Sequence, residues 1–151
     1  MADLIWGENA TPNLEEAKKF ADAIHSKFPG KLLSYNFSPS FKWKKHLSDD
    51  EIGTFQRKIG EMGYNFQFIT LAGFHTQNIA IFELAEKYKK DGMAAYSKIQ
   101  QQEFDREKDC YTSVKHQREV GTSYFDAVSN TISGGKSSTT AMEGSTESEQ
   151  F

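Results

Sequence analysis

Polar side chains occur at alternating positions where a buried strand would otherwise continue. The segment "LLSYNFSPSFKWKKH" covers residues 32–46, and its polar residues recur at every second place: Asn36, Ser38 and Ser40. Because residues two apart in an extended chain share a face, these side chains project the same way if the extended geometry continues. An amide and two hydroxyls can donate hydrogen bonds to an anion, each contributing about 1.5–3 kcal/mol. The spacing therefore predicts a site for a small anionic ligand.

Two further positions join this predicted site. Glu8 follows a short apolar run, and Thr70 lies near the end of the run "YNFQFITL" at residues 64–71. In parallel α/β folds, ligands bind off the carboxyl ends of the strands, so one amide, three hydroxyls and one carboxylate would meet at one mouth. The alternative is a strand-to-helix turn in which Asn and Ser satisfy local backbone groups. Spacing alone leaves both readings open.

Three strands, each followed by a helix, must position these residues. Extended runs are expected at residues 3–6, 31–35 and 64–71. Helical spacing of three and four recurs from Leu14 to Phe28, Ile52 to Met62, Ile79 to Tyr88, Met93 to Phe104 and Val120 to Ile132. Thr11 is expected to cap the first helix, with Pro12 at its first position, and Ser48 begins a capping box.

This alternation predicts an α/β fold with right-handed βαβ units on a parallel sheet. A closed (β/α)₈ barrel takes about 250 residues, so a chain of 151 residues with three such units is expected to be part of a barrel. Three regions are predicted: strand segments of the partial barrel at 1–75, a helical region at 76–132, and a Ser/Thr-rich lid or tail at 133–151. Composition alone favours a frayed tail for the last region.

Composition limits the possible partners and the possible sites. Hydrophobic residues make up 37% of the chain, as in a globular protein, and the net charge of -3 disfavours a general polyanion binder. No apolar run is long enough for a membrane span, and a cytoplasmic setting is expected. Cys110 is the single cysteine, which excludes an internal disulfide. The histidines form no close metal-ligand pair, although His75 and His116 fall in loop-like contexts where each could line a site.

Four motifs in order carry a resemblance that runs through essentially the whole chain: "YNFSPSFKWKKHL", "FQFITLAGFH", "KHQREVG" and "SSTTAMEGSTESEQF". Together they resemble the C-terminal part of isocitrate lyases, in the isocitrate lyase and phosphoenolpyruvate mutase superfamily. The resemblance implies the C-terminal part of a (β/α)₈ barrel and a homotetramer with helices exchanged between subunits. It also implies cleavage of isocitrate to glyoxylate and succinate, with Mg²⁺, in the glyoxylate bypass.

The resemblance also implies roles for particular side chains. Four of them would hold substrate carboxylates: Asn36, Ser38, Ser40 and Thr70. Glu8 matches a carboxylate that lines the family's active site near the metal and its waters, and Trp6 matches an aromatic residue in the same wall. The Ser/Thr-rich terminus resembles a lid that closes over bound substrate and excludes water.

The sequence departs from the family pattern at three positions. Phe37 stands where the family usually has Cys, Lys42 where it has Asn, and Asn9 where it has Thr. Phe37 is expected to point away from the mouth, on the face opposite Asn36. The family's Lys-Lys-Cys-Gly-His loop, its metal-binding aspartates and its substrate-anchoring arginine do not occur, and Cys110 is no substitute.

These missing groups matter because cleavage needs a base, a cation and an acid. The expectation is therefore a lyase part that is inactive without the N-terminal half, whose residues would hold the Mg²⁺. Two alternatives remain at this stage: a non-catalytic carboxylate-binding or interaction module, and an inactive fragment.

Overall fold

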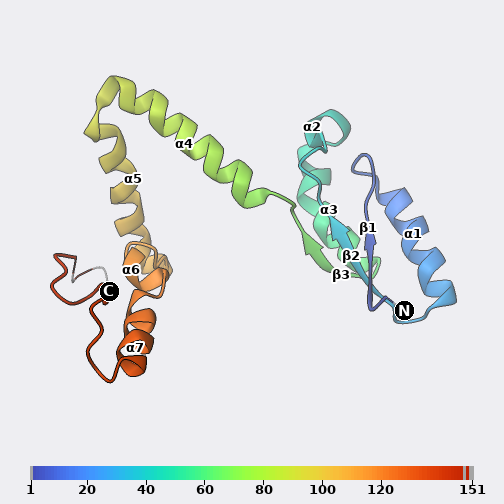
Figure 1. The fold of residues 1–151 in the computed structure, drawn as a ribbon. Helices are drawn as coiled ribbons and strands as arrows, with labels where there is room; N and C mark the ends of the chain where they lie inside the picture. Colours follow the sequence, from blue (N-terminus) through green and yellow to red (C-terminus); the bar gives the residue numbers. More distant parts are fainter. Residues whose placement is uncertain (1, 148, 150–151) are drawn as a thin grey trace. The chain divides into compact units, whose positions relative to one another are not determined.

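The computed structural model describes residues 2–147 and 149, and the chain forms two compact units that meet between residues 80 and 81 (Figure 1). The first unit contains β1 (Leu4–Gly7), α1 (Leu14–Lys27), β2 (Leu32–Asn36), α2 (Trp43–His46), α3 (Asp49–Glu61), β3 (Tyr64–Phe68) and the start of α4 (Ala72–Asp91). The second unit contains the rest of α4, α5 (Met93–Arg106), the 3₁₀ turn η1 (Glu107–Asp109), α6 (His116–Glu119) and α7 (Thr122–Ile132).

The three strands form one parallel sheet in the order β1-β2-β3, which confirms the predicted strand direction. Trp6 pairs with Ser34, and Ser34 pairs with Phe66, next to an irregularity between Leu33 and Ser34. The third strand is shorter than expected, because it ends at Phe68. Helix α4 begins directly afterwards at Ala72. The expected loop context of His75 was therefore wrong, since His75 lies in the first turn of α4.

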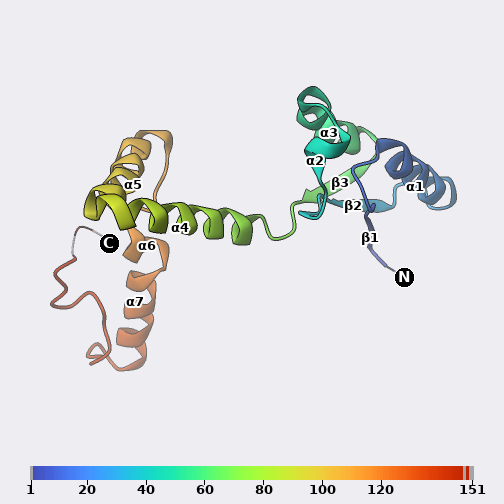
Figure 2. The ribbon, with the colours of Figure 1, turned by 90° about the horizontal axis from the view of Figure 1, so that it is seen from above.

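The helices α1 and α3 pack on one face of the sheet and form the core with it (Figure 2). The buried core side chains are Ala17, Ala21, Leu33, Tyr35, Phe37, Phe41, Phe55, Ile59 and Tyr64. The other face carries the alternate residues of each strand, and of these Trp6 is 54% exposed and Phe66 is 57% exposed. One face of this sheet is thus covered by the unit's own helices, and the other is largely open.

The helix caps agree with prediction at α3 and differ at α1. Ser48 accepts the backbone N–H of Glu51, and the Glu51 carboxylate accepts the backbone N–H of Ser48 at 2.8 Å, so the predicted capping box is confirmed. The Thr11 cap was wrong, because the Oδ1 of Asn13 accepts the N–H groups of Glu15 and Glu16 and α1 begins at Leu14. An Asn side chain caps at least as well as Thr, and here it lies directly before the helix.

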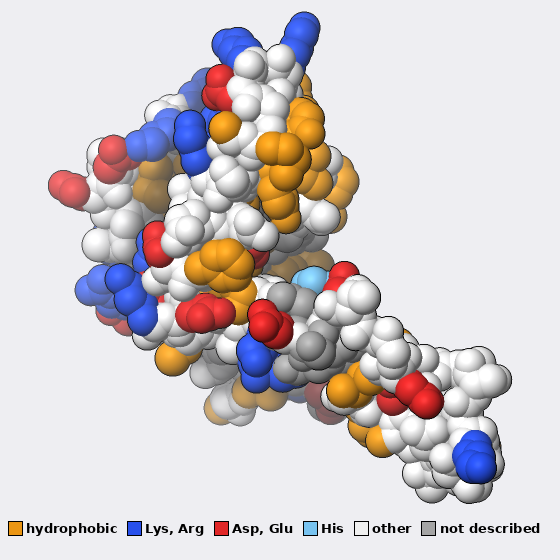
Figure 3. Space-filling view, turned by 90° about the vertical axis from the view of Figure 1, so that its left-hand side faces the viewer, with side chains coloured by type: hydrophobic (Ala, Val, Ile, Leu, Met, Phe, Trp, Pro, Cys, Tyr) orange, Lys and Arg blue, Asp and Glu red, His pale blue; other side chains and the backbone are white. Residues whose placement is uncertain are grey.

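The second unit consists of helices whose apolar side chains are mostly exposed, and Figure 3 shows such side chains on the surface that it draws. The apolar positions predicted from Met93 to Phe104 fall in one helix, α5. The short helix α6 was not expected, and His116 begins it instead of lying in a loop. None of the helices in the described residues is long and apolar enough to cross a membrane.

Candidate functional site

The carboxyl ends of all three strands bring polar side chains into one hydrogen-bonded line. Thr70 Oγ1 donates to Asn36 Oδ1, and Asn36 Nδ2 donates to Glu8 Oε1 at 3.0 Å. Asn36 is the last residue of β2 and only 4% exposed, whereas Glu8 comes directly after β1 and is exposed. The structure thus joins three of the residues that sequence reasoning selected, one from the end of each strand.

Close packing of the β1 backbone at Gly7 fixes the position from which the Glu8 side chain extends. Gly7 is buried, and a Cβ atom at this position would lie 2.8 Å from Cε1 of Tyr64. The Tyr64 hydroxyl is itself held, because it donates to the carbonyl oxygen of Ala17 at 2.8 Å. Only glycine therefore allows β1 to approach the Tyr64 ring this closely. The strand that presents Glu8 is fixed by packing against the core.

The line of hydrogen bonds is polarised toward the Glu8 carboxylate. A hydroxyl donates to an amide oxygen, and the same amide donates to a charged oxygen, which makes the second bond the stronger one. The negative charge of Glu8 at the strand ends opposes the binding of an anion there. A nearby cation or a change of hydrogen-bond partner must offset this repulsion. Asn36 keeps a second N–H group that can donate to a ligand.

Ser38 and Ser40 leave the extended geometry in a turn. The backbone N–H of Ser40 donates to Ser38 Oγ at 3.2 Å, and the N–H of Phe41 donates to the Ser38 carbonyl oxygen at 3.0 Å. Ser38 is buried and Ser40 is exposed. The condition of extended geometry from Asn36 to Ser40 is not met, because Pro39 and Ser40 form a turn. At these two serines the backbone adopts the local turn, which was the alternative that the spacing left open.

The aromatic neighbours of the site lie on both faces of the sheet. Phe37 is 8% exposed and its ring centroid lies 5.3 Å from that of Tyr35, so the expectation that Phe37 points away from Asn36 is confirmed. Trp6 lies on the open face, with its ring edge-on to Phe68 at a centroid distance of 4.8 Å. Trp6 is therefore available as a wall for any group that occupies that face.

Thr70 is directed by an unusual backbone conformation at the next residue. Leu71 has a φ of 62°, in the left-handed region that a residue with a Cβ adopts at a cost of about 1–2 kcal/mol. The Leu71 carbonyl oxygen accepts the N–H of His75 at 3.0 Å, which starts α4. The chain thus makes a turn between β3 and α4, and Thr70 meets Asn36 at this turn.

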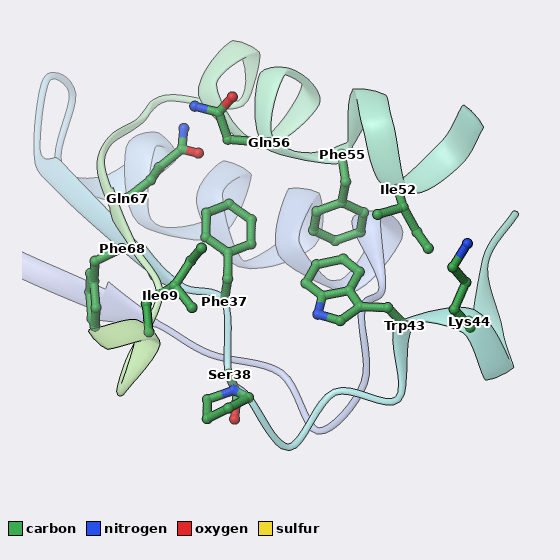
Figure 4. A pocket seen from close by; sticks show the side chains of 12 residues that line it. Phe37, Ser38, Trp43, Lys44, Ile52, Phe55, Gln56, Gln67, Phe68 and Ile69 are labelled. Atoms are coloured by element: carbon green, nitrogen blue, oxygen red, sulfur yellow. The ribbon is translucent and has the colours of Figure 1, made fainter. Parts of the chain in front are cut away.

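An apolar pocket of about 730 Å³ lies next to the ends of β2 and β3, where Ser38, Phe68 and Ile69 line it (Figure 4). Its lining includes the aromatic rings of Phe37, Trp43, Phe55 and Phe68, with Gln56 and Gln67 at one side and Lys44 at the other. Gln67 Oε1 is buried without a hydrogen-bond partner among the described residues. Carboxylates need hydrogen-bond donors, so this mainly apolar pocket suits a dicarboxylate less well than the strand ends do.

The described residues do not fit a complete magnesium site. They contain no group of three or more His, Cys, Asp or Glu side chains placed to hold a metal ion. Mg²⁺ takes oxygen ligands and often binds one or two carboxylates together with several waters. Glu8 offers one carboxylate, and its Oε1 already accepts a bond from Asn36. Cys110 is exposed and follows η1 in the second unit.

Sequence reasoning missed two polar groups that hold loops in place. Asn9 accepts a hydrogen bond from the Tyr35 hydroxyl on the helix-covered side of the sheet. Asp126, in α7, is 8% exposed and accepts the backbone N–H groups of Ala141 and Met142 at 2.8–3.1 Å. No signal in the spacing marks either group, because their partners lie 26 and 15 or 16 residues away along the chain.

Comparison with known proteins gives consistent results along the full chain. The sequence model of the isocitrate lyase family matches residues 1–151. The chain is 63% identical over 150 residues to the isocitrate lyase of Halalkalibacterium halodurans and 57% identical over 152 aligned positions to that of Salmonella typhimurium. It is 55% identical over 149 residues to the bifunctional glyoxylate cycle protein of Caenorhabditis elegans.

These matches cover nearly all of the chain and a minor part of each relative. In all three, 99% of the chain is aligned. The aligned region makes up 35% of the two bacterial proteins and 15% of the C. elegans protein. The chain therefore spans about a third of the length of the two bacterial relatives and a smaller share of the C. elegans protein.

Proposed function

Because the chain belongs to the isocitrate lyase family, we propose that it forms the C-terminal part of an isocitrate lyase, which cleaves isocitrate to glyoxylate and succinate. The observation that carries this proposal is the line from Thr70 through Asn36 to Glu8 at the carboxyl ends of parallel strands. Such strand ends are where ligands bind in parallel α/β folds. The proposed setting is the glyoxylate bypass in the cytoplasm.

In this proposal, the chain binds and encloses the substrate and leaves bond cleavage to groups elsewhere. Four side chains hold substrate carboxylates: Asn36, Ser38, Ser40 and Thr70. The Asn36 amide has a further N–H to donate, and the hydroxyl of Ser38 can still donate while its oxygen accepts the N–H of Ser40. Ser40 is exposed at the turn and can reach a ligand without disrupting the core.

Glu8 and Trp6 form the wall of the proposed site. The negative charge of Glu8 repels substrate carboxylates unless a cation lies nearby. Mg²⁺, when bound, supplies that positive charge and stabilises negative charge on the glyoxylate fragment. Its direct ligands are expected outside this chain, and Glu8 would accept hydrogen bonds from water near it. Trp6 would limit the access of solvent on the open face of the sheet.

The proposed partners are the remainder of the barrel and sister subunits of a homotetramer. Trp6 and Phe66 on the open sheet face, and the exposed apolar side chains of α4, α5 and α7, favour this proposal. Large exposed apolar patches mark protein–protein interaction sites in soluble proteins. Neither nucleic acid nor a membrane is expected as a partner.

The C-terminal segment from residue 133 is proposed as a lid. Asp126 holds the backbone at Ala141 and Met142, and Gln117 Nε2 donates to Glu147 Oε2 at 2.8 Å. These bonds give the segment a defined resting place on α6 and α7. They are few and polar, so releasing the segment toward a substrate costs little buried apolar area.

A chimera tests the proposed function. This chain replaces the 150 matching residues of the H. halodurans isocitrate lyase, and glyoxylate release from isocitrate is measured with Mg²⁺ present. We expect activity that falls about 10–100-fold in kcat/KM on Ser38→Ala, because a hydrogen bond to a charged group contributes about 1.5–3 kcal/mol. Ser26→Ala is the matched control, since Ser26 bonds only locally to Ala23 at the end of α1.

Two results would contradict the proposal. A folded, correctly assembled chimera that releases no glyoxylate would exclude the lyase function of this sequence. Equal losses for Ser38→Ala and Ser26→Ala would exclude a binding role for Ser38. Calorimetry of the 151-residue chain with succinate separates the alternative, because measurable affinity together with an inactive chimera indicates a carboxylate-binding module.

A further inference from the structure

A second line of hydrogen bonds runs beside the first, from the core to the surface of α1. The Tyr35 hydroxyl donates to Asn9 Oδ1 at 2.8 Å, and Asn9 Nδ2 donates to Glu16 Oε2 at 3.0 Å. Asn9 directly follows Glu8, and Tyr35 directly precedes Asn36. Two adjacent pairs of residues are therefore joined side chain to side chain, Glu8 to Asn36 and Asn9 to Tyr35.

The core holds Tyr35 rigidly. Its side chain is fully buried, with ring centroids of Phe37 and Tyr64 each at 5.3 Å. Burial, followed by the charges of Tyr64, Glu16 and Glu8, raises the pKa of Tyr35 far above its ordinary value. The hydroxyl therefore remains neutral and remains a donor at physiological pH. A buried hydroxyl that lost its acceptor would leave an unsatisfied polar group in the core.

The other end of this line is anchored at the first turn of α1. The backbone N–H of Glu16 donates to Asn13 Oδ1 at 3.1 Å, so the helix cap holds the residue whose carboxylate accepts from Asn9. The loop between β1 and α1 is thus attached to the core on one side and to the capped helix on the other. An exposed glutamate side chain without such a bond keeps most of its rotamer freedom.

We infer that Tyr35, Asn9 and Glu16 are positioning residues that hold the loop after β1 so that the Glu8 carboxylate faces Asn36. None of the three touches the proposed ligand. They act through the backbone of residues 8 and 9. That Glu8 matters for catalysis rests on the function proposed above. The amide of Asn9 suits this place because it accepts from one neighbour and donates to the other at the same time.

The first test measures the geometry of the site in the 151-residue chain without any ligand. The readout is solvent exchange of the Asn36 side-chain amide, observed by NMR. Tyr35→Phe removes only the hydroxyl, and we expect exchange to become about tenfold faster as Glu8 loses its fixed position. Asn9→Ala removes the acceptor instead of the donor and should have the same effect, with circular dichroism as the check that this variant stays folded.

The control for lost stability is Ile59→Val, which removes part of a fully buried core side chain in α3. This change breaks no hydrogen bond of the line from Tyr35 through Asn9 to Glu16. Ile59→Val should lower stability while the Asn36 amide exchanges as before. If Ile59→Val changed the exchange of the Asn36 amide as much as Tyr35→Phe did, the effect would be general loss of stability and the inference would be wrong.

A reversed hydrogen bond provides the rescue. Asn9→Asp retains the acceptor for Tyr35 and places a second negative charge beside Glu16, so slow exchange should be lost. Adding Glu16→Gln supplies an amide that donates to the new carboxylate and removes the repulsion. The double variant should return the Asn36 exchange rate to within about twofold of the original chain. Failure of this rescue, with both variants folded, would overturn the inference.

The active chimera adds a kinetic readout. Tyr35→Phe should lower kcat about tenfold at a temperature where the protein is fully folded, with KM nearly unchanged, because small displacements of a group in the active site affect the reaction step. A chimera that is inactive before substitution would refute the proposed function alone. The exchange rate of the Asn36 side-chain amide would still test, without any activity, whether the three residues position Glu8. Unchanged kcat and unchanged exchange in Tyr35→Phe would refute the inference alone.

Discussion

The two units of the chain differ in where they place apolar side chains. In the first unit, Leu33, Tyr35 and Tyr64 of the sheet pack against α1 and α3, and nine of the ten described residues that make up the buried hydrophobic core lie there. The tenth is Ala95 in the second unit, where larger side chains such as Phe125 remain exposed. Burial of apolar area supplies most of the stability of a fold. The first unit thus has a core of its own, and the second has almost none.

This difference shows what positions each polar group. Asn36 and Tyr35 are held by a strand that is packed into a core, so their side chains act from fixed points. Asp126 and Gln117 instead hold the C-terminal segment from helices with few buried neighbours. The first arrangement suits a binding site that must keep its geometry, and the second suits a segment that moves.

The largest expected effect tests the core directly. Phe55 is 1% exposed, and Phe55→Ala should lower the free energy of unfolding of the first unit by about 3–5 kcal/mol. Phe125 is 62% exposed, and Phe125→Ala should change the stability of the chain by about 0.5 kcal/mol or less. Urea unfolding followed by tryptophan fluorescence measures the first effect, since the Trp43 ring lies 5.1 Å from that of Phe55, and the circular dichroism of the helices measures the second.

A milder variant keeps this comparison measurable if Phe55→Ala does not fold. Ile59 is fully buried, and Ile59→Val should cost about 0.5–1.5 kcal/mol. Similar costs for Phe55→Ala and Phe125→Ala would contradict the contrast between the units, because they would require a core around Phe125.

The second effect concerns the attachment of the C-terminal segment. Asp126→Ala removes the acceptor for the N–H groups of Ala141 and Met142, bonds to a charged group that contribute about 1.5–3 kcal/mol. Amide exchange at these two residues should become about 10–100-fold faster, while exchange within β2 stays the same. Asp91→Ala, at the end of α4, is the control. Unchanged protection of Ala141 in Asp126→Ala would show that other contacts hold the segment.

The smallest effect is a difference in pH dependence between two exposed carboxylates. Hydrogen bonds from Ser48 lower the pKa of Glu51 in the first unit, and a hydrogen bond from Gln117 lowers the pKa of Glu147 in the second. A depressed pKa means that each bond stabilises the fold above the ordinary pKa of glutamate. That contribution is lost as the pH falls through the lowered value.

An NMR titration of both carboxyl groups checks the cause of these shifts. Gln117→Ala should return the pKa of Glu147 toward its ordinary value and leave that of Glu51 unchanged. Ser48→Ala should raise the pKa of Glu51 alone. A response of both groups to either variant would indicate a change in overall charge or folding, and the two local bonds would not be the cause.

Element types could be read from the sequence because they depend on local patterns. The strand at β2 and the capping box at Ser48 follow from alternation and from residues three apart. Thr11 was wrong as a cap because Asn13 offers the same chemistry two residues later. The last residues of the third predicted strand were wrong because Leu71 adopts a left-handed conformation, and propensity does not reveal such a turn.

The sequence by itself determined the order of the strands and of the longer helices, the parallel sheet, and the selection of Glu8, Asn36 and Thr70 as candidate site residues. Only the tertiary structure decided that these three bond to one another, that Ser40 lies in a turn, and that Asn9 bonds to Tyr35. Periodicity depends on neighbours along the chain and survives in any context. The direction of a side chain beyond a strand end depends on which distant atoms pack against its backbone, and folding alone brings those atoms together.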